Sequence, residues 1–382
     1  MREVFLAGAA STRFAKRRGV NAASLAGEAL NQLMDATGLE PGQIDAAFGG
    51  TLLGGSLLTQ RAMQEIGVSG PPMYTVENAC ASGASAINLA WQAVASGTAE
   101  CVVAFGAENL SDLGGGTLPL GAKDVEATLG MVMPAAYAMR AQRYLADFDA
   151  TEDTLDLVSV KNRANGARNP RAHFQKEVGV EEVRGSRHVA DPLRLLHCCP
   201  NTDGASAVVV CSAEFAKTSR APSARILASV IRSGSFHTGY RDMTWPDITY
   251  RAATAAYEMS GLKPSDVDLV ELHDAFSISE LLHAEALGLA ERGQAHRRLA
   301  DGDFHRDGRV PINPSGGLMS RGHPVGATGV TQVCEAYWQL TGQAGDLQLP
   351  APRVALTQVT GGGIFGVDNG ACGVHIISAE DQ

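Results

Sequence analysis

Hydrophobic and polar positions follow the same order in two separate parts of the chain. Residues 25–37 and 250–260 have the apolar spacing of amphipathic helices. Each segment runs into a stretch that begins with Gly and continues with Pro, GLEPGQID at 38–45 and GLKPSDVD at 261–268. An apolar run with the length of a buried strand follows each stretch. Because Gly ends a helix and Pro prevents its continuation, we predict the same helix–turn–strand unit in both parts.

A second pair of segments repeats in the same way. CASGAS begins at Cys80 and HPVGAT begins at His323, and each opens a helical pattern rich in small residues. Both helices lead to an apolar run typical of a central strand, at 99–108 and 352–363. Cys80 and His323 therefore occupy equivalent positions, and they could face each other if the two parts pack about a pseudo-two-fold axis.

This repetition indicates a duplicated α/β architecture. Ser, Pro and charge separate two strand-like runs at 216–224. We therefore assign residues 1–220 to an N-terminal half and 221–382 to a C-terminal half. The segment at about 110–200 has no counterpart of similar length in the second half, and we predict an insertion over one face of the core that contributes to a substrate-binding lid.

The composition agrees with a large buried core and excludes some functions. Of 382 residues, 45% are hydrophobic, 5% are aromatic and 43 are Gly, which favours helices packed closely on buried strands. The net charge of -10 argues against non-specific nucleic-acid binding. The short basic stretch RFAKRR (13–18) is either a solvated loop or a contact for a ligand phosphate.

The N terminus and the cysteines predict a cytoplasmic protein. MREVFLAGAA (1–10) is typical of a first strand rather than of a signal peptide. No uninterrupted apolar segment reaches 18 residues, so we expect no membrane span. Seven cysteines without framework spacing fit a reducing compartment, and the absence of any CxxC pair predicts no metal site.

Four segments carry residues suited to acyl transfer. Cys80 stands among small residues at a predicted helix start, where the helix N terminus lowers the pKa of a thiol, although a buried structural cysteine would fit the same pattern. His323 opens the second such helix and His273 ends a strand-like run, so each is a candidate base or oxyanion donor, or else a packing histidine. The run TGGGIFG (360–366) can present backbone N–H groups to a ligand or simply form a tight turn.

The order of these motifs resembles the thiolase superfamily over almost the whole chain. The matching segments are CASG (80–83), PNTDGASAVVV (200–210), HDAF (273–276), GHPVGATG (322–329) and GGGIFG (361–366). HDAF in place of NEAF makes the chain most similar to the sterol-carrier-protein-type and archaeal-type thiolases. The resemblance implies a duplicated five-layer αβαβα thiolase fold, with two mixed sheets, an insertion lid domain and two buried central helices.

The resemblance also implies a role for each candidate residue. Cys80 would be the nucleophile that forms an acyl thioester from an acyl-CoA, and His323 would take its proton. His273 would complete one oxyanion site, and the backbone N–H groups of Cys80 and Gly361 would form a second. Coenzyme A would be substrate and product, with no permanently bound cofactor. The family implies a homodimer or a dimer of dimers, with the strand at 99–108 near the interface.

The sequence departs from the family at the second catalytic cysteine. The two positions where thiolases carry it are Val359 and Ala275 here, and neither is occupied by Cys198, Cys199 or Cys334. Three explanations stay open: an active-site histidine acts as the base, the substrate is an activated β-dicarbonyl that needs no such base, or a partner subunit completes the site. Thiolases of this type often pair with a small zinc-ribbon/OB-fold protein.

We therefore predict an acyl-CoA C-acyltransferase of lipid metabolism that forms or cleaves a carbon–carbon bond next to a CoA thioester through acyl-Cys80. The alternative on the same frame is aldol or retro-Claisen cleavage of an activated CoA ester, or acyl transfer to a small acceptor. A third hypothesis is a non-enzymatic acyl carrier or structural subunit. The joint presence of Cys80, His273 and His323 argues against it.

Overall fold

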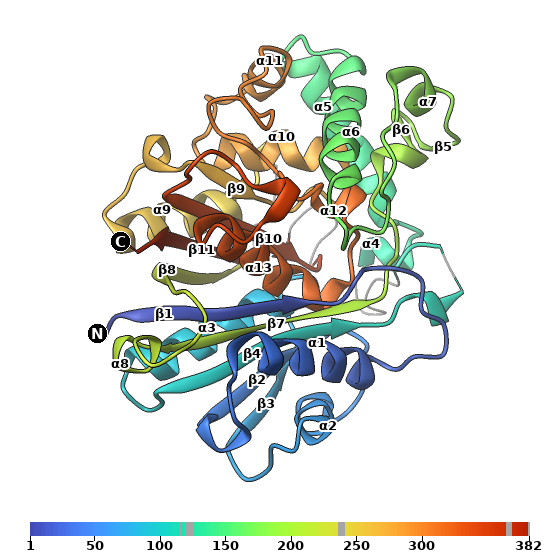
Figure 1. Ribbon diagram of the computed structural model, residues 1–382. Coiled ribbons are helices and arrows are strands. Elements are labelled where there is room, and N and C mark those ends of the chain that lie inside the picture. The colour runs from blue at the N-terminus through green and yellow to red at the C-terminus, as the bar shows by residue number, and fades with distance from the viewer. Residues whose placement is uncertain (115, 119–124, 236–240, 364–368, 381–382) are drawn as a thin grey trace.

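The computed structural model describes residues 1–114, 116–118, 125–235, 241–363 and 369–380 (Figure 1). The strands are β1 (Val4–Ser11), β2 (Ala46–Gly50), β3 (Met73–Val76), β4 (Cys101–Glu108), β5 (His188–Ala190), β6 (Leu193–Arg194), β7 (Gly204–Ser212), β8 (Ala224–Ser233), β9 (Leu269–Glu271), β10 (Val354–Gly361) and β11 (Ala371–Ala379). The helices are α1 (Ala22–Thr37), α2 (Leu58–Glu65), α3 (Ser82–Ala95), α4 (Val125–Thr128), α5 (Met133–Asp147), α6 (Asp153–Ala167), α7 (Val180–Arg184), α8 (Ala213–Ala216), α9 (Asp247–Ser260), α10 (Ser277–Ala286), α11 (Ala295–Ala300), α12 (Gly317–Ser320) and α13 (Thr328–Leu340).

The order of the strands shows the duplication. The hydrogen-bonded order is β3-β2-β4-β7-β1-β8-β11-β10-β9, so β2, β4, β7 and β1 of the first half correspond to β9, β10, β11 and β8 of the second. In both halves an equivalent parallel pair, β2 with β4 and β9 with β10, adjoins antiparallel pairs, and β3 adds a second parallel pair to the first half. The resemblance implies two separate mixed sheets, whereas the structure joins them at one place. The pairs Phe5–Arg225 and Leu6–Ala224 between β1 and β8 join them into a nine-stranded sheet.

Three apolar clusters fill the spaces between the five layers that the resemblance implies, and one of them covers both sides of the central helices. Successive residues of a strand face opposite sides of a sheet, so Val103 of β4 packs outward on α1 and α2, whereas Val102 packs inward on α3 and α13. In the second half, Ala355 of β10 also packs inward, whereas Leu356 packs outward with α9 and α10. Figure 1 shows α3 and α13 between the strands of the two halves.

The central helices approach closely because small residues line their contact. A Cβ atom at Gly83 of α3 would lie 2.7 Å from the carbonyl oxygen of Gly326, and one at Gly329 of α13 would lie 2.4 Å from the backbone nitrogen of Ala84. Real Cβ atoms do not approach other atoms so closely, so a larger side chain at either glycine would push the helices apart. The start of α3 thereby comes to lie beside the start of α13, which is where Cys80 and His323 are found.

The segment between β4 and β7 is a long insertion, whereas residues 362–370 alone join the equivalent strands β10 and β11. Its helices α5 and α6 lie across the outer face of the second half, beside α10 (Figure 1). Tyr144 of α5 and Leu155 of α6 belong to the same apolar cluster as Leu281 of α10. A segment of the first half therefore covers the second half, and it ends near the central helices.

Two further predictions concern surfaces. Within the described ranges, no helix is both long enough and apolar enough to cross a membrane. The strand at 99–108 was expected near a dimer interface. The structure places β4 between β2 and β7, where its residues are buried on both faces. Its place near a dimer interface stays a prediction. The edge strand of the sheet in the first half is β3, where Tyr74 is exposed.

Candidate active site

The three side chains predicted to carry chemistry meet in the folded chain. His323 Nε2 lies 3.3 Å from Cys80 Sγ. The rings of His273 and His323 have centroids 5.3 Å apart, and one nitrogen of each ring and the sulfur all lie within 4.8 Å of one another. Residues from both halves therefore build one site, as their equivalent positions in the repeat predict.

A tight turn before α3 positions Cys80. Ala79 has a φ of 49°, a left-handed conformation that costs a residue with a side chain about 1–3 kcal/mol. Hydrogen bonds hold this turn: the Ser82 hydroxyl donates to the carbonyl oxygen of Ala79 at 2.6 Å and accepts from the backbone N–H of Asn78 at 2.9 Å. The turn leaves the thiol at the start of the helix, facing a cavity.

The tautomer of His323 follows from its second hydrogen bond. His323 Nδ1 lies 2.7 Å from the Thr328 hydroxyl oxygen, and this hydroxyl donates to the carbonyl oxygen of Pro324 at 3.2 Å. We assign the single hydroxyl proton to the carbonyl oxygen, so that toward Nδ1 the hydroxyl is an acceptor and Nδ1 carries the ring proton. The lone pair of Nε2 then faces the Cys80 thiol. Burial lowers the pKa of His323 well below its usual value, so the ring is neutral.

His273 has the opposite tautomer. The backbone N–H of Thr360 donates to His273 Nδ1 at 3.3 Å, and the Thr360 hydroxyl lies 2.7 Å from the same nitrogen. Because a backbone N–H can only donate, Nδ1 is an acceptor and Nε2 carries the proton. His273 Nε2 is buried and has no hydrogen-bond partner among the described residues. Burial lowers the pKa of His273 to about 3, so a neutral N–H donor borders the cavity.

Two buried carboxyl groups hold the loops around these residues. Glu108, at the end of β4, accepts hydrogen bonds from the backbone N–H groups of Leu52, Leu53 and Gly326 at 2.8–3.1 Å. Asp274 accepts from the backbone N–H of Leu318, at 2.7 Å. These contacts fix the segments before and after His323. Sequence reasoning missed Glu108, because its partners are distant in the chain.

The resting thiol is protonated. Burial raises the pKa of Cys80 to about 12, and the charge of Glu108 adds to the effect, against hydrogen bonds from the backbone N–H groups of Gly362 and Cys80. The expected lowering of this pKa does not hold for the resting site, because loss of hydration raises the pKa more than the backbone hydrogen bonds lower it. Cys80 and His323 form a neutral S–H···N pair whose proton has a short path to Nε2.

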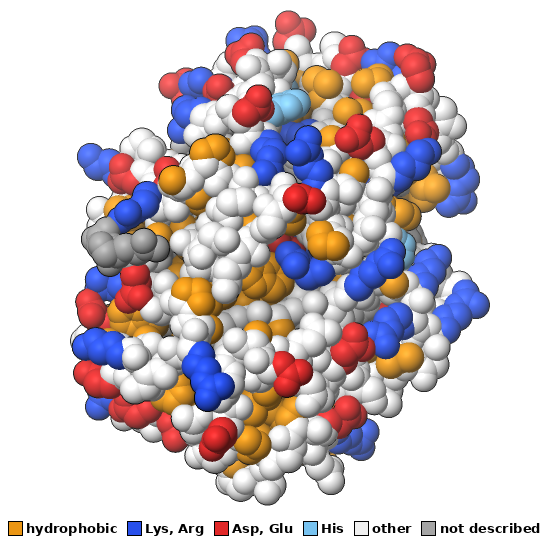
Figure 2. Space-filling view, in the orientation of Figure 1, with side chains coloured by type: hydrophobic (Ala, Val, Ile, Leu, Met, Phe, Trp, Pro, Cys, Tyr) orange, Lys and Arg blue, Asp and Glu red, His pale blue; other side chains and the backbone are white. Residues whose placement is uncertain are grey.

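The cavity above the pair measures about 510 Å³ and is walled largely by the insertion. Its aromatic wall is the stacked pair Tyr137 and Phe276, with centroids 4.5 Å apart. Figure 2 shows Lys and Arg side chains gathered at the edge of the molecule where, in Figure 1, the loop after β1 meets the insertion. Among the described residues that line the cavity, three carry a cationic side chain: Lys16, Arg18 and Arg187. The basic stretch at 13–18 thus reaches the site.

Family models cover both halves of the chain. The model described as "Thiolase, N-terminal domain" matches residues 4–214, and "Thiolase C-terminal domain-like" matches residues 232–367. The chain belongs to the thiolase family. The resemblance seen in its motifs is thereby confirmed, and so is the fold class.

Curated relatives of this thiolase extend over nearly its whole length. The benzoylsuccinyl-CoA thiolase subunit BbsB of Thauera aromatica is 41% identical over 95% of both chains. The acetyl-CoA acetyltransferase of Methanothermobacter thermautotrophicus is 38% identical over 99% of this chain and 100% of its own. Human sterol carrier protein 2 is 35% identical over 93% of this chain and 69% of its own. Among solved structures, the Ltp2-ChsH2(DUF35) aldolase has a TM-score of 0.87 at 28% identity, over 100% of this chain and 98% of its own.

The glycine run of this thiolase reaches the nucleophile. Gly361 ends β10, and a Cβ atom there would lie 2.1 Å from the carbonyl oxygen of Asn78, so the strand packs directly behind the Cys80 turn. Besides the backbone N–H of Cys80 itself, that of Gly362 bonds to the sulfur, and Gly362 also lines the cavity. The oxyanion role of Gly361 stays a prediction. The rest of GGGIFG, residues 364–366, lies outside the described residues.

The two positions that lack the second cysteine are both close to the site. Val359 packs in a small cluster with Ala81 and Cys80, and Ala275 lines the cavity. Cys199 also lines the cavity, and its backbone N–H donates to the carbonyl oxygen of Ala275 at 2.9 Å. Cys334 is buried on α13 in the central layer. No local signal in the sequence could reveal that Cys199 lies beside Ala275, since folding alone brings the two segments together.

The Cys-His-His donor set contains the ligand types that zinc prefers. In this structure, His323 Nε2 is already paired with the thiol, and the pairing accounts for the position of both groups without an ion. The absence of a permanent metal or cofactor stays a prediction.

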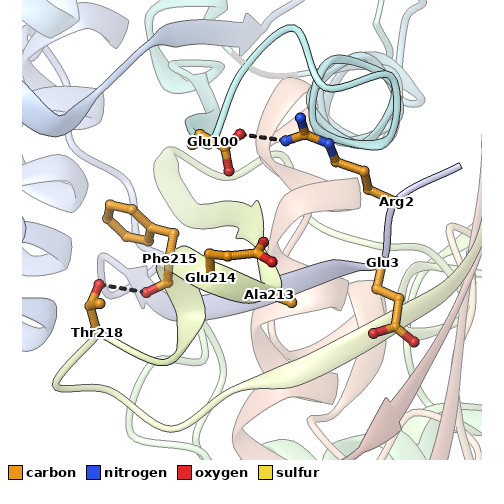
Figure 3. Close-up of a pocket in the computed structure, with 7 residues that line it drawn as sticks. All are labelled: Arg2, Glu3, Glu100, Ala213, Glu214, Phe215 and Thr218. Atoms are coloured by element: carbon orange, nitrogen blue, oxygen red, sulfur yellow. Dashed lines mark hydrogen bonds and ion pairs between the residues drawn. The ribbon is translucent and has the colours of Figure 1, made fainter.

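A separate hollow of about 820 Å³ lies between the start of β1 and α8 (Figure 3). The residues described there include Glu3, Glu100 and Glu214, together with Arg2, which pairs with Glu100. None of its described lining residues is a cysteine or histidine. The described lining of this hollow therefore contains none of the residues to which the sequence assigns chemistry.

Proposed function

We propose that this chain is an acyl-CoA C-acyltransferase that forms or cleaves a carbon–carbon bond next to a CoA thioester through an acyl-Cys80 intermediate. One observation carries the proposal: the Cys80 thiol faces the neutral Nε2 of His323 at 3.3 Å, on the wall of a cavity that also presents the unpartnered N–H of His273. This arrangement supplies a nucleophile, a base and an oxyanion donor.

The first step follows from the tautomers. His323 Nε2 takes the proton of Cys80, and the sulfur attacks the carbonyl carbon of the substrate. The His323 cation is stabilised by the Thr328 hydroxyl, which accepts from its Nδ1–H. The Nε2–H of His273 and the backbone N–H groups of Cys80 and Gly361 are the donors we propose for the developing oxyanions. One such donor contributes about 2.7–4 kcal/mol to the transition state.

The cavity also accounts for the binding of an acyl-CoA. Lys16, Arg18 and Arg187 place positive charge where the phosphates of CoA would enter, and guanidinium groups bind phosphate through paired hydrogen bonds. The stacked pair Tyr137 and Phe276 offers an apolar surface to the acyl group. We therefore propose CoA as substrate and product, and an acyl group that extends beyond acetyl.

A second candidate function is cleavage of an activated CoA ester by retro-aldol chemistry. The apolar Ala275 and Val359, at the positions of the family's second cysteine, favour it, because proton transfer at an unactivated carbon then lacks its usual group. The similarity to the Ltp2-ChsH2(DUF35) aldolase supports the same candidate.

Assembly remains part of the proposal. The edge strand β3 is exposed, and an unpaired strand edge is a template for pairing with a second copy, which supports a homodimer or a dimer of dimers. One relative is described as a subunit and one solved neighbour pairs Ltp2 with ChsH2(DUF35). Both support a partner protein, for which we propose the small zinc-ribbon/OB-fold type. A cytoplasmic location stays a prediction.

The test is the intact mass of the purified chain after incubation with acetyl-CoA, a longer acyl-CoA and an aromatic acyl-CoA. We expect a gain equal to the acyl group in the wild type and none in Cys80→Ala. An aldolase would leave the mass unchanged and cleave a β-hydroxyacyl-CoA instead. Equal adducts on wild type and Cys80→Ala would refute acyl transfer through this cysteine.

A further inference from the structure

We propose that Cys199 is a catalytic residue of this site, which transfers the proton at the substrate carbon next to the CoA thioester. The proposal rests on the proposed function, because it assigns the proton step of that reaction. It also answers the question that the sequence left open, namely which group replaces the cysteine absent from positions 275 and 359.

The backbone places Cys199 directly opposite Ala275. Cys198 and Phe276 form an isolated antiparallel bridge, and the backbone N–H of Cys199 donates to the carbonyl oxygen of Ala275 at 2.9 Å. Opposite residues in an antiparallel pair project from the same face, with Cβ atoms about 4.5–5.5 Å apart. Cys199 and Ala275 both line the cavity. A thiol from one segment thus lies beside the alanine that replaces a cysteine on the other.

A second observation shows that this part of the cavity is built for a ligand. His273 is 4% exposed, and its Nε2 has no partner among the described residues. A buried N–H without a partner costs about 1–3 kcal/mol, so its place on the cavity wall is explained by a substrate oxygen. Cys199 therefore faces a cavity that holds Cys80, the acyl-forming nucleophile, and His273, the oxyanion donor.

The charge environment supports the same assignment. Burial raises the pKa of Cys199 well above its usual value, and the neighbouring Cys198, Asp274 and Cys80 raise it further. The resting thiol is therefore protonated and can act as an acid. Because of the coupling to Cys80, ionisation of either thiol opposes ionisation of the other. This fits a reaction in which the two thiols are ionised in different steps.

In the cleavage direction the protons and electrons balance. After Cys80 has given its proton to His323 and attacked the β-carbonyl, the carbon–carbon bond breaks and its electron pair goes to the carbon next to the thioester. Cys199 donates its proton to that carbon, which releases the fragment that still carries the original CoA thioester, while the shortened acyl group stays on Cys80. The Cys199 thiolate then takes the proton of an incoming CoA thiol. The CoA sulfur attacks acyl-Cys80, and the leaving Cys80 sulfur recovers the proton from His323.

The experiment separates this proton step from acylation. The full-length chain is incubated in D2O with acetyl-CoA, propionyl-CoA and succinyl-CoA. Mass spectrometry follows acylation of Cys80 and, separately, deuterium uptake at the carbon next to the thioester. General acid–base catalysis contributes about 10²–10⁴-fold. In Cys199→Ala and Cys199→Ser we therefore expect deuterium uptake to fall at least about 100-fold relative to acylation, measured with the acyl-CoA that acylates best.

A double variant distinguishes a chemical role from a structural one. Ala275→Cys in the Cys199→Ala background returns a thiol to the opposite position of the bridge, and we expect deuterium uptake to recover at least about tenfold. A structural cysteine would tolerate Ser, and Ala275→Cys would restore nothing. Uptake in Cys199→Ala equal to wild type overturns the proposal, as does acylation of wild type without uptake for any donor. If the wild type forms no acyl-Cys80 at all, the proposed function itself fails.

Discussion

The hydroxyl of Thr328 decides which nitrogen of His323 faces the nucleophile. Its oxygen lies 2.7 Å from His323 Nδ1, in a fully buried contact. Thr328→Val keeps the shape of the side chain and removes this acceptor. The Nδ1–H then loses its partner at a cost of about 1–3 kcal/mol, and the alternative tautomer, with its proton on Nε2, cannot accept the proton of Cys80.

A change of about 1–3 kcal/mol corresponds to a roughly 5–150-fold lower rate. We expect this loss in the first-order formation of acyl-Cys80, followed by rapid acid quench and intact mass. Thr328→Ser retains the hydroxyl and should keep a rate within about threefold of wild type.

Thr331 supplies the matched control, because it lies one turn further along α13 and is also buried. Its hydroxyl bonds to Ser206 and to the carbonyl oxygen of Ala327, not to His323. Thr331→Val should lower Tm without slowing acylation comparably. Acylation by Thr328→Val at the wild-type rate, in a folded protein, would refute the tautomer assignment and with it the role of His323 as base.

Three other predictions follow from the contacts around the cavity. Because the pKa of His273 is lowered to about 3 in the folded chain, the unfolded state binds its proton more readily below about pH 6.5. Acidification from pH 7 to 5 should therefore remove about 2 kcal/mol of stability through this residue. The fall in Tm should be smaller in His273→Gln, and an identical fall would contradict the assignment. Glu108→Gln replaces an acceptor of three backbone N–H groups by a neutral amide. We expect a loss of about 1–3 kcal/mol in urea unfolding, together with slower acylation because the loop at Gly326 shifts. Arg187→Ala should raise KM for an acyl-CoA roughly tenfold with little change in kcat. For an acyl-pantetheine, which lacks the nucleotide phosphates, the same variant should have the wild-type KM. An equal rise in KM for both substrates would exclude phosphate binding by Arg187.

Much of the fold could be predicted from local patterns in the sequence. Gly38 and Gly261 end their helices in the left-handed conformation, and the helix–turn–strand units around them fold as their repeated sequences predict. The equivalence of Cys80 and His323 predicted that the two residues could face each other, and the structure places them in hydrogen-bond contact. These inferences succeeded because helix ends and strand periodicity depend on neighbouring residues. The duplication can be found by comparing two segments of the sequence.

The chemistry of the site was decided by tertiary structure. The pKa of Cys80 rises rather than falls, because burial in the folded protein outweighs the backbone hydrogen bonds to the sulfur. Glu108 becomes an anchor for two loops only when folding brings Leu52 and Gly326 to its carboxylate. Cys199 reaches Ala275 through a backbone hydrogen bond between segments that are distant in sequence. Hydrophobic spacing along the chain determines which face of an element is buried, but desolvation, tautomers and contacts between distant segments depend on where every other element packs.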